Sequence, residues 1–219
     1  MTAPPFFPQP TAPPFFPLRL APDDVPPAPD PGPAPVVLLY GDSFTHQGTW
    51  PQHLSDLLRV SVGNNAAGGS GFVQVGSGTT FPHAVTTRRA DGAAVVVVYG
   101  GVNEQWLPQS VEAVRLAAVV TLAAARAANP RAVIVLVAPQ WPATAPSPLM
   151  LAIRDQLRPV AAAAGVTYVD PLTWLVGRPD LIGPDGLHPN ELGQRYIAAR
   201  MAPIVQTALD QYRRQEQAA

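Results

Sequence analysis

The sequence predicts an α/β fold in which helices cover both faces of a parallel β-sheet. Short apolar runs rich in valine and isoleucine recur along the chain without the alternating polar residues of a half-exposed strand, which indicates strands buried on both faces. Segments with the apolar spacing of amphipathic helices lie between these runs. Strands that alternate with helices need crossover connections, and such connections join parallel strands.

The predicted strands and helices alternate along the chain. Residues 93–99 form the most distinct strand, because β-branched residues dominate it. Residues 108–129 are predicted to form a helix that ends at Asn129-Pro130, since proline cannot continue a helix. The predicted strands are 36–40, 60–62, 93–99, 132–138 and 166–170. The predicted helices are 49–59, 108–129, 146–164 and a last helix capped by Asn190.

Prolines and glycines limit two of these assignments. Residues 72–89 contain Gly76, Gly78 and Pro82, which interrupt any helical pattern, so no element is predicted there. Pro203 lies within the last predicted helix and should kink it or split it in two, because it removes a backbone donor and crowds the preceding turn.

The first 35 residues differ in composition from the rest and predict a separate proline- and phenylalanine-rich arm, followed by one domain over residues 36–219. The segment Thr-Ala-Pro-Pro-Phe-Phe-Pro occurs at 2–8 and again at 11–17. Such segments favour extended polyproline-like conformations. One interpretation is a disordered leader, but four phenylalanines are unusual in disordered chains. We therefore expect the arm to dock on its own domain, a second subunit or another partner through its aromatic pairs.

Composition excludes several classes of function. The net charge is about −1, which gives no electrostatic reason to expect nucleic acid as a partner. The sequence has no cysteine, so disulfides and thiolate chemistry are excluded. No apolar stretch of about 18 residues predicts a membrane span, and the start of the chain does not resemble a secretory signal peptide. The cytoplasm is the expected compartment, with an exported or phage-borne protein as the alternatives.

A serine follows the first predicted strand directly. The apolar run 36–40 stops at Gly41-Asp42-Ser43, where glycine allows a tight turn. Ligands bind at the carboxyl edge of open parallel sheets, so the Ser43 hydroxyl is a candidate nucleophile. The alternative is that Asp42 and Ser43 only cap the helix that follows.

Near the end of the chain a carboxylate precedes a histidine by three residues, at Asp185 and His188. In a turn that enters a helix this spacing brings both side chains to one face, so the carboxylate accepts one ring proton and the other nitrogen is free to act as a base. A serine hydroxyl needs such a base. His46, His53 and His83 lack an acid at this spacing and are interpreted as surface or loop histidines.

Two glycine-rich turns follow predicted strands between these ends. Residues 64–71 contain Gly69, and residues 100–104 contain Asn103. Each turn could present backbone N–H groups or an amide donor to a developing oxyanion at the same edge as Ser43. Each alone is also a common connection from a strand to a loop.

Four of these segments, in this order, resemble the conserved blocks of the SGNH (GDSL-type) hydrolases. The segments are Gly41-Asp42-Ser43, Gly69, Asn103 and Asp185 to His188. The resemblance covers roughly residues 36–210. It implies a three-layer α/β/α sandwich of flavodoxin-like type with a parallel sheet of about five strands in the order 2-1-3-4-5. It also implies an activity among the serine esterases, lipases, carbohydrate deacetylases and thioesterases.

The resemblance also implies a role for five residues. Ser43 would be the nucleophile, His188 the base and Asp185 the acid that orients the base. The N–H groups of Ser43 and Gly69 and the side-chain amide of Asn103 would form the oxyanion hole. No cofactor is implied. No metal is expected either, because Asp185 and His188 are better explained as partners of each other and no second ligand cluster is present.

Three departures from the family pattern bear on the substrate. Phe44 replaces the usual leucine, Ala66 stands where many members have glycine or serine, and Glu104 replaces the usual aspartate. None removes a catalytic atom. They leave the substrate preference open, and Glu104 is expected to change how the loop of Asn103 is held.

Aromatic residues suggest how a substrate would be held. All four tryptophans follow a predicted strand end: Trp50, Trp106, Trp141 and Trp174. Such side chains suit stacking on a sugar ring or lining an acyl pocket, and the alternative for each is that it seals a loop onto the core. The candidate substrate-binding residues are Phe44, Trp106, Trp141 and Leu187.

The predicted function is therefore hydrolysis of acyl esters through an acyl-enzyme, with a weak preference for short-chain or acetyl esters of carbohydrates. The substrate would be a small molecule or a glycan. Two alternatives stay open: an acyltransferase that uses the same triad, and a glycan-binding module without activity.

Overall fold

The structure, a computed structural model, describes residues 34–88, 92–106, 111–142 and 144–219. The predicted arm of residues 1–35 lies almost entirely outside these ranges, so its boundary and its docking stay predictions. Within the described ranges, no helix has the length and apolar character needed to cross a membrane.

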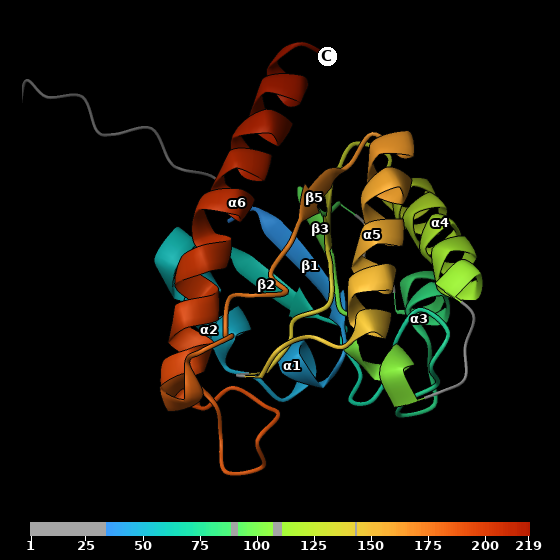
Figure 1. Cartoon of the computed structure of the whole chain (residues 1–219). Coiled ribbons are helices and arrows are strands. Elements are labelled where there is room, and N and C mark those ends of the chain that lie inside the picture. The colour runs from blue at the N-terminus through green and yellow to red at the C-terminus, as the bar shows by residue number, and fades with distance from the viewer. Residues whose placement is uncertain (1–33, 89–91, 107–110, 143) are drawn as a thin grey trace, which may run out of the picture. The chain divides into compact units, whose positions relative to one another are not determined.

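Five parallel strands form one sheet in the order β2-β1-β3-β4-β5 (Figure 1), which confirms the predicted flavodoxin-like arrangement. The strands are β1 Val36–Gly41, β2 Ser61–Asn64, β3 Val95–Tyr99, β4 Val133–Val137 and β5 Thr167–Val169. Gly41 of β1 pairs with Tyr99 of β3, which pairs with Val137 of β4. The three central strands therefore end at the same level, and the loops after them share one edge.

Helices cover both faces of the sheet, as predicted (Figure 1). α2 and α6 pack on one face, and α3, α4 and α5 pack on the other. The α-helices are α1 Ser43–His46, α2 Trp50–Leu58, α3 Phe81–Thr87, α4 Val111–Ala128, α5 Pro148–Ala163 and α6 Glu191–Gln217. The short 3-10 helices are η2 Val102–Trp106 and η3 Pro179–Leu181.

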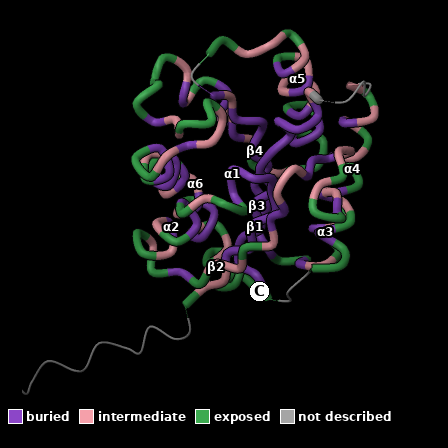
Figure 2. The backbone as a smooth tube through the Cα atoms, turned by 90° about the horizontal axis from the view of Figure 1, so that it is seen from below, coloured by how far each residue is buried: buried purple, intermediate pink, exposed green. Residues whose placement is uncertain are grey.

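The sheet is buried on both faces because its side chains alternate between two apolar clusters. Val96 and Val98 of β3 pack toward α3, α4 and α5, whereas Val95 and Val97 pack toward α2 and α6. Figure 2 shows the buried residues concentrated along the sheet, between the helices. Uninterrupted valine runs are thus explained by burial on both sides.

The structure differs from the predicted elements at two prolines. α3 lies within residues 72–89, where no element is predicted; the Thr80 side chain caps it, and Pro82 stands in its first turn, where a missing N–H costs nothing. α6 continues past Pro203 without being split. Pro203 and Ala199 are both exposed, so water can solvate the carbonyl that proline leaves without its helical partner.

Candidate active site

Ser43 stands at the carboxyl edge of the sheet, as the first residue of α1 and two residues after β1. The Asp42 side chain caps this helix and accepts the N–H of Phe44 at 3.0 Å. Gly41 permits the turn, because a Cβ there would lie 2.6 Å from the carbonyl oxygen of Tyr99. The end of β1 therefore fixes the serine on a short helix rather than on a free loop.

The structure brings Ser43 and His188 together although 145 positions separate them. His188 Nε2 lies 2.8 Å from Ser43 Oγ, and His188 Nδ1 lies 2.6 Å from Asp185 Oδ2. The second oxygen of Asp185 accepts the N–H groups of Leu187 and His188, each at 3.0 Å. Serine, imidazole and carboxylate thus form one continuous hydrogen-bonded chain.

Asp185 carries a negative charge over the whole ordinary pH range. The hydrogen bond from His188 lowers the pKa of its carboxyl to about 2, and the N–H groups of Leu187 and His188 act in the same direction. An ionised carboxylate accepts the Nδ1 proton, which leaves Nε2 as the acceptor toward Ser43. This arrangement suits a histidine that removes the proton of a serine hydroxyl.

Hydrogen bonds hold the loop that carries His188 in place, within the loop itself and to α6. The N–H of Gly183 donates to the carbonyl of His188 at 2.7 Å. Gln194 of α6 donates through Nε2 to the carbonyl of Pro189 at 3.2 Å and accepts the N–H of Trp50 at 3.2 Å. Gln194 therefore links this loop to the start of α2, a role for which the sequence pattern holds no signal.

Gly69 and Asn103 come from the loops after β2 and β3. Asn103 is buried, and its Nδ2 donates to the carbonyl of Ser70 at 2.9 Å, which leaves its second amide hydrogen for another acceptor. Gly69 has φ +72°, a backbone conformation that favours glycine. Among the described residues, no acceptor is found for the N–H of Ser43 or of Gly69. Both N–H groups could therefore bind a negatively charged oxygen.

Two buried carboxylates belong to the loops of the site, Asp42 directly before Ser43 and Glu104 directly after Asn103, and sequence reasoning assigned neither of them to the chemistry. Burial raises the pKa of Asp42 to about 7, and the charge of Glu104 adds to this effect while N–H groups oppose it. Burial likewise raises the pKa of Glu104. A carboxylate directly after a fully buried strand is the sequence signal that could have identified Asp42 as desolvated.

The candidate substrate-binding residues lie in different environments. The Phe44 ring is buried with its centroid 5.5 Å from that of His188. Leu187 and Trp141 are half-buried, and both pack partly against the core; the Trp141 Nε1 donates to Thr144 at 3.2 Å. The side chain of Trp106 lies outside the described part, so its role stays a prediction.

The remaining tryptophans, Trp50 and Trp174, pack in or against the apolar cluster between the sheet and α2 and α6. Trp50 is fully buried and packs its ring 5.8 Å from that of Tyr99, so the interpretation as a core residue holds for it. Trp174 packs against the apolar cluster under α6, with the Arg200 guanidinium 5.6 Å from its ring.

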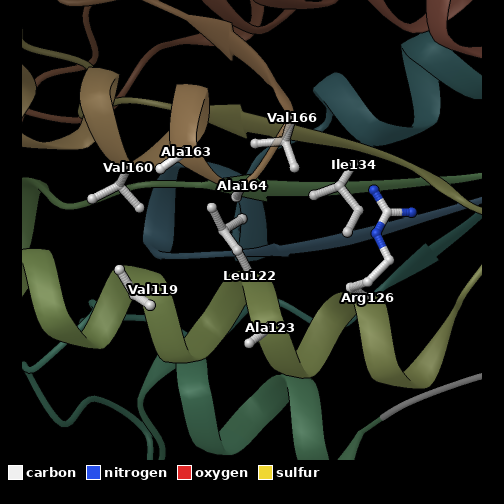
Figure 3. A pocket seen from close by; sticks show the side chains of 9 residues that line it. All are labelled: Val119, Leu122, Ala123, Arg126, Ile134, Val160, Ala163, Ala164 and Val166. Carbon is white, nitrogen blue, oxygen red and sulfur yellow. The ribbon is translucent and has the colours of Figure 1, made fainter.

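An apolar cavity of about 290 Å³ lies between α4 and α5 (Figure 3), and Ser43 is not among its lining residues. Its lining includes Leu122, Ile134, Val160 and Val166. Ile134 lies near the start of β4 and Val166 directly before β5, so the cavity lies near the amino ends of these strands, whereas Ser43 follows the carboxyl end of β1. It is therefore not the pocket in which a substrate would meet Ser43.

Within the described part of the chain, no three histidine, aspartate or glutamate side chains gather closely enough to hold a metal ion.

A parallel α/β sheet with serine, histidine and aspartate hydrogen-bonded in series is an arrangement of the serine hydrolases. The sequence pattern of the GDSL-like lipase/acylhydrolase family matches residues 39–196. The chain belongs to this family, that of the SGNH hydrolases, and is an enzyme of the esterase type.

Known relatives agree with this assignment. A GDSL lipase of Mycobacterium tuberculosis is 36% identical over an alignment of 191 residues, and the match covers 79% of this chain and 82% of the relative. A carbohydrate esterase of family 3 from Talaromyces cellulolyticus has a similar structure, with a TM-score of 0.62 and 18% identity over 81% of this chain and 99% of that one. A salicylyl-acyltransferase from a tetracycline biosynthetic pathway is also similar, with a TM-score of 0.65 and 19% identity over 82% of this chain and 57% of that one.

Proposed function

We propose that the protein hydrolyses carboxylic esters through an acyl-enzyme formed on Ser43, with His188 as general base and Asp185 as the residue that orients it. The observation that carries the proposal is the 2.8 Å contact between His188 Nε2 and Ser43 Oγ. A base must lie within hydrogen-bond reach of the proton that it removes, and this distance satisfies the requirement.

In the first step, His188 Nε2 takes the hydroxyl proton while Ser43 Oγ forms a bond to the carbonyl carbon of the ester. The carbonyl oxygen receives the electron pair of its π bond and becomes an oxyanion. The N–H groups of Ser43 and Gly69 and the free amide hydrogen of Asn103 stabilise this charge. When the tetrahedral intermediate collapses, the alcohol leaves with the proton from His188, and the acyl group stays on Ser43.

In the second step, His188 removes a proton from water, and the resulting hydroxide attacks the acyl carbon. The same three donors hold the oxyanion, and Ser43 Oγ leaves as the acyl–oxygen bond breaks. The proton on His188 then returns to the serine, so the products are a carboxylic acid and the regenerated enzyme.

We infer short-chain or acetyl esters of carbohydrates as the substrate class. Leu187 directly precedes His188 and is half-buried, and Trp141 is half-buried in the loop after β4. Apolar side chains at this edge of the sheet would suit a sugar ring carrying a small acyl group. The similarity to the carbohydrate esterase from Talaromyces cellulolyticus is in keeping with this class.

Acyl transfer to an alcohol other than water is the second candidate function. The similarity to a salicylyl-acyltransferase favours it, because the acyl-enzyme is the same and only the second acceptor differs. Nitrophenyl esters of increasing chain length, assayed with and without an acceptor alcohol, separate the two. A transferase should form a new ester, whereas a hydrolase should release the free acid at the same rate in both assays.

Covalent labelling tests the proposed nucleophile. A fluorophosphonate should modify the wild-type protein, and peptide mass spectrometry should locate the modification on Ser43. Prior treatment with phenyl acetate should slow the labelling, because acyl-enzyme occupies the same oxygen. A glycan-binding module without activity would give no labelling, and a label on any other residue would show that the nucleophile is wrongly assigned.

Replacement of Trp141 by alanine should weaken substrate binding more than it weakens folding. We expect KM for an acetylated sugar to rise about tenfold or more, which is typical for loss of an apolar pocket contact. Trp174→Ala is a matched control, because Trp174 packs under α6 beside Arg200, and its KM should stay at the wild-type value. A large loss of thermal stability in Trp141→Ala with an unchanged KM would assign Trp141 to core packing instead.

A further inference from the structure

Glu104 is a buried carboxylate that no step of the proposed reaction uses. It directly follows Asn103 in η2, and only 1% of its surface is exposed. Its Oε1 atom accepts the N–H groups of Val73 at 3.0 Å and Gln74 at 3.3 Å. A single side chain thus connects the helix that carries Asn103 to the loop that carries Gly69.

The neighbouring residue makes a second connection to the same loop. Asn103 Nδ2 donates to the carbonyl of Ser70 at 2.9 Å. On its other side the loop is attached to β1, because Ala67 N–H and Ser70 Oγ both donate to the carbonyl of Gly41, at 2.9 and 3.3 Å. The N–H of Gly69 therefore lies in a segment held from both sides.

Gly71 lies directly against the Glu104 carboxylate. A Cβ at this position would lie 2.1 Å from Glu104 Oε1 and 2.5 Å from Oε2. The backbone of Gly71 does not have a positive φ, so its conformation does not require glycine, and the nearest atoms that a side chain would meet are those of the Glu104 carboxylate. Glu104 therefore fills the space that a side chain at position 71 would take.

We propose that Glu104 is a positioning residue that holds the two loop donors of the oxyanion hole, the N–H of Gly69 and the amide of Asn103, at a fixed distance from Ser43. This inference rests on the proposed function. Its physical reason is that donors stabilise an oxyanion only when they are held in place before the reaction, so small displacements cost much of the rate.

Three substitutions at Glu104 distinguish the effect of side-chain length from the effect of negative charge. Glu104→Gln keeps an Oε1 acceptor at the same distance and should keep most of kcat. Glu104→Asp is one methylene shorter and Glu104→Ala has no acceptor, so both should lower kcat by about tenfold to a hundredfold with KM little changed. Glu112→Asp, at an exposed position of α4, is a matched control and should leave kcat unchanged.

Gly71→Ala tests the same contact from the opposite side. The added methyl group should displace the Glu104 carboxylate and lower kcat by about as much as Glu104→Ala. In the double variant the carboxylate is absent and the methyl group has room, so kcat should be no lower than in Glu104→Ala alone. Losses that multiply in the double variant would contradict the inference.

The measurement is kcat per active site, with the number of sites titrated by the fluorophosphonate, so that misfolded protein does not count. Inhibition by a phenylboronic acid, whose tetrahedral adduct carries a negative oxygen, should weaken in parallel with kcat. If Glu104→Ala does not fold, the comparison of Glu104→Asp with Glu104→Gln decides. Wild-type kcat per site in Glu104→Asp would overturn the inference, whereas failure to label the wild type would overturn the proposed function itself.

Discussion

Ser43→Ala should lower kcat/KM for a nitrophenyl acetate by about 10⁴-fold to 10⁶-fold, and loss of His188 in addition should cost almost nothing more. The reason is that the two side chains act as one unit. The imidazole has no proton to remove once the Ser43 hydroxyl is gone, and the hydroxyl is hardly nucleophilic without the base 2.8 Å away.

Rates for Ser43→Ala, His188→Ala and the double variant form a cycle that measures this dependence. All three should share nearly the same residual rate, which comes from the oxyanion donors and from binding. His83→Ala is a suitable control, because His83 is an exposed residue of α3 bonded to Thr79, and its rate should match the wild type. Independent losses that multiply in the double variant would mean that Ser43 and His188 do not act on the same proton.

The strands of the sheet were predictable because a strand that is buried on both faces has an uninterrupted apolar sequence. The runs at 93–99 and 132–138 contain no polar residue, and the structure has β3 and β4 within them. The strand order required the resemblance to a known family, since periodicity does not say which strands pair. α3 was not predicted because Gly76 and Gly78 stand shortly before it and interrupt any helical pattern. The Thr80 cap and tertiary packing define this helix.

The site was predictable only as far as parallel strands share an edge. Ser43 and Asn103 each follow a strand end, and the turn of His188, which directly precedes α6, meets Ser43 at the same edge. The contacts of Gln194 and Glu104 depend on how loops distant in sequence approach one another. The local pattern around Gln194 gives no sign of its contacts, whereas Glu104 was noted only as a departure from the family pattern, without its partners.

Asp42→Asn should reduce the pH dependence of stability between about pH 4 and pH 7. Burial raises the pKa of this carboxyl from 3.8 to about 7 in the folded protein, whereas in the unfolded chain it ionises near its ordinary value. Between these values the folded state binds more protons than the unfolded state, so the free energy of unfolding falls as pH rises. The full difference corresponds to at most about 4 kcal/mol. Burial also raises the pKa of Glu104, so Glu104 contributes with the same sign and remains in the variant.

Asparagine has no charge to desolvate, and its side-chain oxygen can still accept the N–H of Phe44 that caps α1. Urea unfolding at pH 5 and pH 8 should therefore show a smaller loss of stability for Asp42→Asn than for the wild type. Asp56→Asn is the matched control, because Asp56 is exposed on α2 and water solvates it in both states. Asp185 and Glu191, whose pKa values are lowered to about 2 by hydrogen bonds, change stability only below this window and with the opposite sign. If the free energy of unfolding of Asp42→Asn depended on pH as steeply as that of the wild type, water would have to solvate the Asp42 carboxylate in the folded protein, contrary to the inference from its burial.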